Sequence, residues 1–538
     1  MRKILTACAL FLSFSGITQP GSSAPERPKL VVGIVVDQMR WDYLYRYADR
    51  YNSGFKRLLS EGFSCENTFI PYTPTYTAAG HASIYTGSVP ALNGIIGNYW
   101  YSPVLKRNWY NSEDTTVQTV GSTSTAGKMS PRNLWATTIT DELRLATNFK
   151  SKVIGLALKD RGSILPAGHS ANQAYWFDNT SGGWITSTYY MNDLPAWVKQ
   201  LNEKKLPDQY LSQNWNTLYP IETYKNNTGD DKPYESMIPN EGNKFPHNTA
   251  AITRDKYNSF RYTPFANTYL VESAKAAVDA EKLGNNGTTD FLALSFSSTD
   301  YIGHEFGPNS IEAEDTYLRL DRDLGNLLRY LDQKVGKGQY VVFLSADHGA
   351  AHIPGFLKEN KIPAGAWDDA EVQVYLNKVL GNMYGIKNAV AKIVNYQIYF
   401  NSSFIPADKI TAVKQTITDS LLSQPSIANV IDLRSIGSAN LPENVKRMLQ
   451  NGYNQKLSGD MQFIFKPGWF DGGSRGTTHG NWHPYDSHIP LLWFGWKIPK
   501  GRLNRETYMT DIAVTLAALL HIQMPNAAVG KVIEEVVK

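Results

Sequence analysis

The sequence LVVGIVVD at residues 30–37 is a short apolar run that ends abruptly in a carboxylate. A strand buried on both faces of an open sheet has this pattern, because its side chains meet the core until the strand reaches the sheet edge. Three further runs end in the same way. They cover residues 153–158, 291–296 and 340–344, and they lead to Lys159, Asp300 and Asp347. The sequence therefore predicts parallel strands that present polar residues at one edge.

Helical periodicity lies between these apolar runs. In residues 316–335, leucines recur at intervals of three and four residues, and Thr510 is expected to cap another helix with an apolar stripe that reaches Leu520. Residues 489–496 form one more candidate strand. Alternating strands and helices predict an α/β fold with a doubly wound, mostly parallel sheet.

Two long stretches interrupt this alternation. Residues from about 176 to 261 are rich in Asn, Tyr, Trp, Pro and Gly, and residues from about 353 to 465 separate the Asp347 strand from the last strand. No flexible linker composition flanks them, so we expect two large insertions that pack on the active-site side of the core. The predicted organisation is a single catalytic domain at 25–538.

The composition is that of a globular protein: of 538 residues, 42% are hydrophobic and 19% are charged. The formal charge of +4, from 53 basic and 49 acidic residues, indicates no nucleic-acid partner. Only Cys65 follows the predicted leader, so we expect no internal disulfide and interpret Cys65 as a buried apolar residue. We expect a monomer that acts on small molecules.

The N-terminus has the features of an export signal. Arg2 and Lys3 precede a short apolar run and then small and polar residues, which predicts a signal peptide at approximately 1–24 and a periplasmic or secreted protein. No later apolar stretch reaches the roughly 20 residues that a membrane span needs, so none is expected in the mature chain. A lipid anchor at Cys8 is the less favoured alternative.

Carboxylates and imidazoles gather at the predicted strand ends. The set comprises Asp37, Asp300, His304, Asp347, His348 and His479. Taken singly, each is more simply a turn former, a helix cap or a core histidine. Jointly, three carboxylates and three imidazoles make two sets of three, and mixed oxygen and nitrogen donors suit Zn²⁺. Three protein ligands per ion leave the open position of a catalytic zinc, so we expect two Zn²⁺ per chain.

The stretch PTYTAAGH at residues 74–81 supplies a candidate nucleophile, Thr77. The small residues after Thr77 allow close backbone approach and open a short helix, whose N-terminal N–H groups favour an anion. Alone, Thr77 is more simply a helix cap. Beside metal ligands, its hydroxyl is a nucleophile that a cation can activate.

Seven motifs in this order resemble the phosphate-irrepressible alkaline phosphatases of bacteria, a branch of the alkaline phosphatase superfamily. They are VVDQMRW at 35–41, PTYTAAGH at 74–81, GNYW at 97–100, LKDR at 158–161, STDYIGH at 298–304, SADHG at 345–349 and GTTH at 476–479. The resemblance runs from about residue 27 to the C-terminus. It implies an alkaline-phosphatase-like core.

The resemblance also implies a role for each site residue. Thr77 becomes a phosphothreonine. One zinc is bound by Asp300, His304 and His479, and the other by Asp37, Asp347, His348 and Thr77. The non-bridging phosphoryl oxygens are held by Asn98, Lys159 and Arg161, in agreement with the preference of a dianion for charged donors. His488 remains an alternative ligand to His479.

The sequence thus predicts an alkaline phosphatase that hydrolyses phosphate monoesters through two zinc ions and a phosphothreonine, with broad substrate range and an alkaline optimum. Sulfatases carry Cys-x-Pro-x-Arg, which does not follow Cys65. A phosphodiesterase of the same superfamily is the alternative. A less favoured reading is an exported binding protein with structural zinc, whose aromatic-rich stretch 176–190 grips a ligand.

Overall fold

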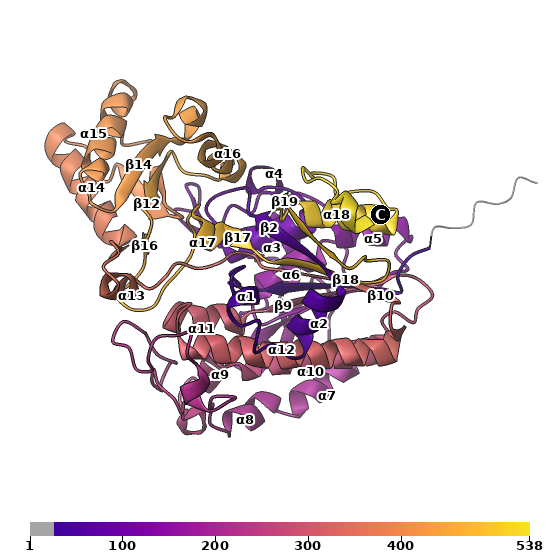
Figure 1. Ribbon diagram of the computed structural model, residues 1–538. Coiled ribbons are helices and arrows are strands. Elements are labelled where there is room, and N and C mark those ends of the chain that lie inside the picture. Colours follow the sequence, from indigo (N-terminus) through magenta and orange to yellow (C-terminus); the bar gives the residue numbers. More distant parts are fainter. Residues whose placement is uncertain (1–25, 538) are drawn as a thin grey trace, which may run out of the picture.

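The computed structural model describes residues 26–537. The predicted signal peptide and Cys8 lie outside the described residues. An eleven-stranded sheet forms the centre of the molecule (Figure 1). Its strands run in the order β17 (His488–Ile489), β2 (Phe63–Phe69), β18 (Leu491–Gly495), β10 (Tyr340–Ser345), β1 (Leu30–Val36), β9 (Asp290–Phe296), β6 (Val153–Ala157), β7 (Gln173–Asp178), β8 (Gly183–Ser187) and β5 (Thr119–Val120), with β19 (Gly501–Tyr508) pairing with β2.

The four strands at the middle of this sheet, β10, β1, β9 and β6, are parallel. In register, Val32 of β1 lies between Leu292 of β9 and Val342 of β10, and every residue of the four strands is buried. These are the four apolar runs from which the fold was predicted. The predicted α/β class with a mostly parallel sheet is confirmed.

Helices cover both faces of the sheet (Figure 1). On one face lie α2 (Gly54–Glu61), α10 (Phe265–Glu281) and α12 (Ile311–Leu331), and on the other α3 (Thr77–Thr86), α6 (Asp160–Ala167) and α18 (Asp511–Leu520). Close approach of α3 needs Gly33 on β1, where a Cβ would lie 2.4 Å from the Tyr85 hydroxyl. The helix that carries Thr77 is therefore pressed onto the centre of the sheet.

One helix start and one helix cap differ from prediction. Helix α12 begins at Ile311, five residues before the predicted start at 316, because Ser310 caps it and accepts a hydrogen bond from Ala313 N at 3.1 Å. Thr510 precedes α18 as predicted, but its side chain makes no capping bond. The Asp511 carboxylate instead accepts from Tyr508 N at 2.9 Å and orders the chain that enters the helix.

The two stretches treated as insertions behave differently. Strands β7 and β8 extend the large sheet, so the predicted start of the first insertion at about 176 is wrong and the chain as far as residue 187 belongs to the core. Within 353–465, a separate four-stranded sheet has the order β12 (Val390–Val394), β13 (Gln397–Phe400), β15 (Met461–Phe465), β14 (Ile427–Asp432). Helices α14 (Asp369–Tyr384) and α15 (Ile410–Leu422) pack on it around a hydrophobic cluster of its own. The single-domain description of 25–538 stays a prediction.

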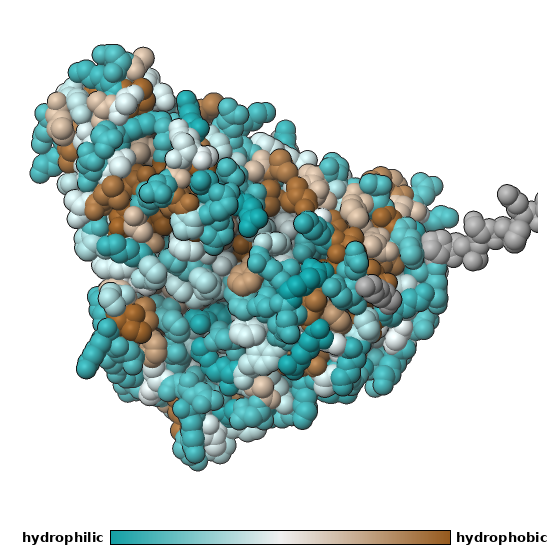
Figure 2. Space-filling view, turned by 45° about the horizontal axis from the view of Figure 1, so that its top comes forward, coloured by the Kyte–Doolittle hydropathy of each residue, from teal (hydrophilic) through white to brown (hydrophobic). Residues whose placement is uncertain are grey.

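Among residues 26–537, no helix is both long and apolar enough to cross a bilayer. Figure 2 shows a largely hydrophilic face on which apolar residues form small, separated groups.

Shortening a buried side chain of α12 is expected to destabilise the core. Leu324 is fully buried where α12 packs against Gly54 of α2, so Leu324→Ala should lower the free energy of unfolding by roughly 2–5 kcal/mol. Leu422→Ala removes the same atoms from an exposed leucine on α15 and serves as the control. Urea denaturation of both variants measures the difference. Equal losses would show that Leu324 is not a core contact.

Candidate functional site

The carboxyl ends of the central strands place three aspartates side by side. Asp37 follows β1, Asp347 follows β10, and Asp300 lies in the first turn of α11 (Ser298–Phe306), directly after β9. All three are buried. Neighbouring parallel strands end at the same edge of a sheet, so the predicted convergence of these side chains follows from the strand order.

One cluster of possible metal ligands comprises Asp300, His304 and His479, whose ligand atoms all lie within 4.8 Å of one another. Asp300 and His304 are one helical turn apart on α11, with 3.1 Å between Asp300 Oδ1 and His304 Nε2. His479 Nε2 is 3.8 Å from the same Oδ1. His488 is not in this cluster, because its Nε2 contacts the carbonyl of Glu66 at 2.8 Å.

A second cluster adjoins the first and comprises Asp37, Asp300 and His348. His348 Nε2 lies 3.5 Å from Asp37 Oδ1, 3.4 Å from Asp347 Oδ2 and 3.3 Å from Thr77 Oγ1. Asp300 therefore belongs to both clusters, whereas the resemblance assigned it to one metal only. Asp347 and Thr77 join the second cluster through their contacts with His348.

The three clustered histidines are all oriented in the same way. Their Nδ1 atoms lie 2.7–2.9 Å from backbone carbonyls, His304 with Thr477, His348 with Gly349 and His479 with Thr75. A carbonyl oxygen only accepts, so each Nδ1 carries the proton and each Nε2 is left with a free lone pair that faces the carboxylates. This is the tautomer that a metal-binding histidine needs.

Two buried carboxylate oxygens close to His348 lack a hydrogen-bond donor. Among the described residues, Asp37 Oδ1 and Asp347 Oδ2 accept no hydrogen bond. Burial raises the pKa of Asp37, and the negative charges of Asp300 and Asp347 raise it further, against the opposing charge of Lys159. Unpaired buried oxygens and crowded negative charge are unfavourable without a cation. The residues therefore fit divalent metal ions.

Thr77 lies at the start of α3, where small residues bring the helix against the metal-ligand edge. A Cβ at Gly80 would lie 2.5 Å from the backbone oxygen of Asp347, so only glycine permits this approach. His81 donates from Nδ1 to the Thr77 carbonyl at 2.9 Å. Ala78 N donates to Asn98 Oδ1 at 3.0 Å, which leaves the Asn98 Nδ2 free to donate beside Thr77.

Lys159 and Arg161 approach from the end of β6. Lys159 Nζ bridges Asp37 Oδ2 at 2.7 Å and Asp300 Oδ2 at 2.5 Å. Burial lowers the pKa of Lys159, but the charges of Asp300 and Asp37 outweigh burial, so the pKa lies above its ordinary value. Arg161 donates to the Tyr110 hydroxyl at 3.0 Å. Both cations line a cavity of about 400 Å³ together with Asp300 and His304.

The structure thus places the predicted ligands other than His488 near one another, with Thr77 in contact with His348, and adds one residue that was missed. Gln38 donates from Nε2 to Asp300 Oδ1 at 2.8 Å and from its backbone N to Asp347 Oδ1 at 3.1 Å. Its backbone is left-handed, with φ of 63°, so the side chain turns back into the site. A glutamine after a strand-end aspartate carries no signal that distinguishes it from a turn residue.

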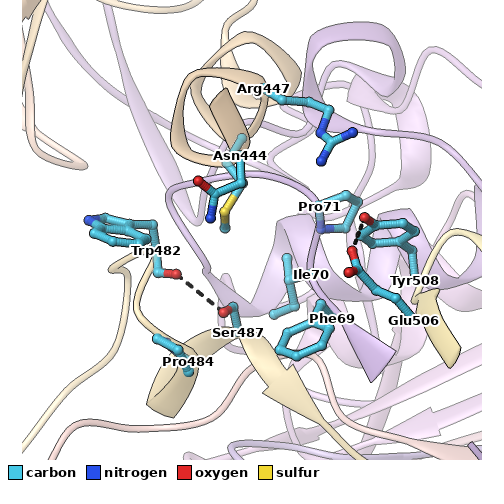
Figure 3. Close-up of a pocket in the computed structure, with 11 residues that line it drawn as sticks. Phe69, Ile70, Pro71, Asn444, Arg447, Trp482, Pro484, Ser487, Glu506 and Tyr508 are labelled. Carbon is cyan, nitrogen blue, oxygen red and sulfur yellow. Dashed lines mark hydrogen bonds between the residues drawn. The ribbon is translucent and has the colours of Figure 1, made fainter. Parts of the chain in front are cut away.

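A different cavity lies behind the segment that leads to Thr77. Figure 3 shows its lining, in which Phe69, Ile70 and Pro71 face Arg447 of α16 (Glu443–Gly452) and Tyr508 of β19. Its volume is about 230 Å³, and none of the candidate ligands or phosphate-binding residues lines it. The candidate active site is therefore identified by the charged groups at the sheet edge and not by this pocket.

Comparison with known proteins identifies the family of this chain. Residues 31–486 match the family described as type I phosphodiesterase / nucleotide pyrophosphatase. The alkaline phosphatase PhoV of Synechococcus elongatus is 53% identical over 95% of this chain and 93% of its own length. The alkaline phosphatase PafA of Elizabethkingia meningoseptica is 49% identical over 96% of both chains. The chain belongs to the PafA-type alkaline phosphatases.

The solved structure of PafA superposes on this chain with a TM-score of 0.93 and covers 96% of this chain and 100% of PafA. The resemblance found in the sequence is therefore confirmed, and so is the alkaline-phosphatase-like core. The protein is an enzyme, an alkaline phosphatase that hydrolyses phosphate monoesters.

Proposed function

We propose that hydrolysis proceeds through a phosphothreonine at Thr77, with two zinc ions, over a broad range of monoesters and with an alkaline optimum. The observation that carries this proposal is the position of Thr77 Oγ1, which lies 3.3 Å from His348 Nε2, the same atom that lies 3.5 Å from Asp37 Oδ1 and 3.4 Å from Asp347 Oδ2. A hydroxyl that lies close to metal-ligand atoms is in a position where a bound metal can activate it as a nucleophile.

The residues that would hold one metal are Asp300, His304 and His479, and those for the other are Asp37, Asp347, His348 and Thr77. When bound, the metals supply Lewis-acid stabilisation of negative charge on the attacking and leaving oxygens. Zinc suits these sites because imidazole supplies half of the six Asp and His ligands, whereas Mg²⁺ and Ca²⁺ prefer oxygen alone.

The chain's own residues account for the two transfers. Thr77 Oγ attacks phosphorus, the bond from phosphorus to the ester oxygen breaks, and an alcohol leaves. Water then attacks the phosphothreonine, and inorganic phosphate and the Thr77 hydroxyl are released. Asn98 Nδ2, Lys159 and Arg161 hold the phosphoryl oxygens, since a dianion gains most from charged and oriented donors.

A phosphodiesterase is the second candidate, favoured by the description of the family that residues 31–486 match. The two candidates differ in the phosphoryl group that the site must hold. A monoester brings two negative charges and a diester one, so cations at Lys159 and Arg161 favour the monoester.

Export to the periplasm, a monomeric state and the absence of a nucleic-acid partner also stay predictions.

The experiment that tests the metal proposal is elemental analysis of the purified enzyme. We expect about two zinc ions per chain, loss of activity on 4-nitrophenyl phosphate with a chelator, and recovery with zinc. His479→Ala should lower the zinc content, whereas His521→Ala, which changes an exposed histidine outside the clusters, should not. Full activity of a metal-free preparation would refute the proposal.

A further inference from the structure

The cavity beside Asp300 and His304 extends beyond the groups that hold the phosphoryl oxygens. Its outer lining includes Tyr262, Tyr301, Glu305 and Arg475, in a volume of about 400 Å³ shared with the inner site. Thr77 does not line it. Nucleophile and leaving oxygen lie roughly in line across phosphorus, so an alcohol that departs away from Thr77 departs into this cavity.

Arg475 is held at the rim of this cavity by the backbone that follows it. Gly476 N donates to the Tyr234 carbonyl at 3.0 Å, and Thr477 N donates to the His304 carbonyl at 2.8 Å. Gly476 has a φ of +71°, and a Cβ there would lie 2.4 Å from the His304 oxygen. The chain beside Arg475 is therefore packed directly against the helix that carries the metal ligands.

Arg475 differs from the other cations near the cavity in having unused donors. Lys159 is bound by two aspartates, Arg161 donates to Tyr110, and Arg261 donates to the Tyr301 hydroxyl at 2.7 Å. Within residues 26–537, the exposed Arg475 guanidinium has no hydrogen bond or ion pair. An unpaired guanidinium offers planar, paired donors that match carboxylate or phosphate oxygens.

We propose that Arg475 forms an anion subsite for the leaving group, so that the enzyme favours monoesters whose alcohol carries a second anionic group. The substrate class is that of phosphorylated hydroxy acids and bisphosphates. This inference rests on the proposed function, since it needs the phosphoryl group beside Lys159 and Arg161. It assigns Arg475 to the alcohol and not to the transferred phosphoryl group.

Two primary alkyl phosphates test the subsite, sn-glycerol 3-phosphate with a neutral alcohol and 3-phosphoglycerate with a carboxylate on the alcohol. The measured quantity is the ratio of kcat/KM for 3-phosphoglycerate to that for glycerol phosphate, which cancels losses common to both. Arg475→Gln should lower this ratio roughly five- to tenfold, and Arg475→Glu should lower it further. In the wild type, added NaCl should also lower the ratio, because the contact is exposed to solvent.

Arg254→Gln is the matched control, since Arg254 is also exposed and lies outside the cavity, and its ratio should equal that of the wild type. The inhibition constant of inorganic phosphate should change less in Arg475→Gln than kcat/KM for 3-phosphoglycerate does. An Arg475→Gln enzyme with the wild-type ratio of kcat/KM values would overturn the subsite. If both kcat/KM values fell equally and inorganic phosphate also inhibited more weakly, Arg475 would act on the phosphoryl group and not on the alcohol. Wild-type enzyme that turns over neither ester with zinc present would instead refute the proposed function.

Discussion

Thr77→Ala should reduce kcat on 4-nitrophenyl phosphate by roughly 10⁴-fold or more, because no other hydroxyl replaces the atom that attacks phosphorus. Thr77 Oγ1 sits 3.3 Å from His348 Nε2 at the start of α3. The variant loses one oxygen and one methyl group and retains every Asp and His of the two clusters. Zinc content should therefore stay close to that of the wild type while turnover collapses.

Thr77→Ser is the matched control, since it restores the hydroxyl and should recover substantial activity. Quenching during turnover and intact mass measurement should show a phosphorylated wild-type chain and an unphosphorylated Thr77→Ala chain. Near-normal turnover by Thr77→Ala with full zinc content would place the nucleophile elsewhere. Loss of zinc from Thr77→Ala would show instead that the hydroxyl is needed as a ligand.

The core of the fold was accessible from sequence because buried parallel strands are apolar on both faces. The run at 30–37 matches β1 and the Asp37 that follows it, and the run at 340–344 matches β10 to within one residue. Strands β7 and β8 were missed because Asn, Gly and Thr between 179 and 188 resemble a loop. Their pairing at the outer side of the sheet overrides that local composition.

The candidate site was predictable in its members but not in its contacts. The three aspartates, His304 and His348 stand just after a strand or one helical turn further on, so the parallel sheet brings them together, whereas His479 comes from the loop that follows β16 (Trp469–Asp471). Nothing in the sequence shows that Asp300 adjoins both clusters or that Lys159 bridges Asp37 and Asp300. Those relations depend on the order β10, β1, β9, β6, which places Asp37 between the other two aspartates and Lys159 beyond Asp300. Strand order is a tertiary property that local patterns do not encode.

Replacing Lys159 and Arg161 together with Ala should decrease monoester hydrolysis far more than diester hydrolysis. Both cations line the cavity that contains Asp300 and His304, and each charge-assisted bond to an anion contributes about 1.5–3 kcal/mol. A monoester presents one more negative charge and one more non-bridging oxygen than a diester. The ratio of kcat/KM for 4-nitrophenyl phosphate to that for bis(4-nitrophenyl) phosphate should fall by roughly 10- to 100-fold.

The bridging position of Lys159 makes one control essential. Its ammonium offsets the charges of Asp37 and Asp300, so its loss also changes the surroundings of the metal ligands. Zinc content must therefore be measured on the same sample. Altered metal binding would lower the monoester and diester activities together, whereas loss of charge recognition would lower the monoester rate selectively. The exposed pair Lys204→Ala and Arg254→Ala removes the same two charges outside the cavity and should leave the ratio unchanged. Equal losses on both esters at full zinc content would show that these cations do not recognise the second charge, and would favour the phosphodiesterase.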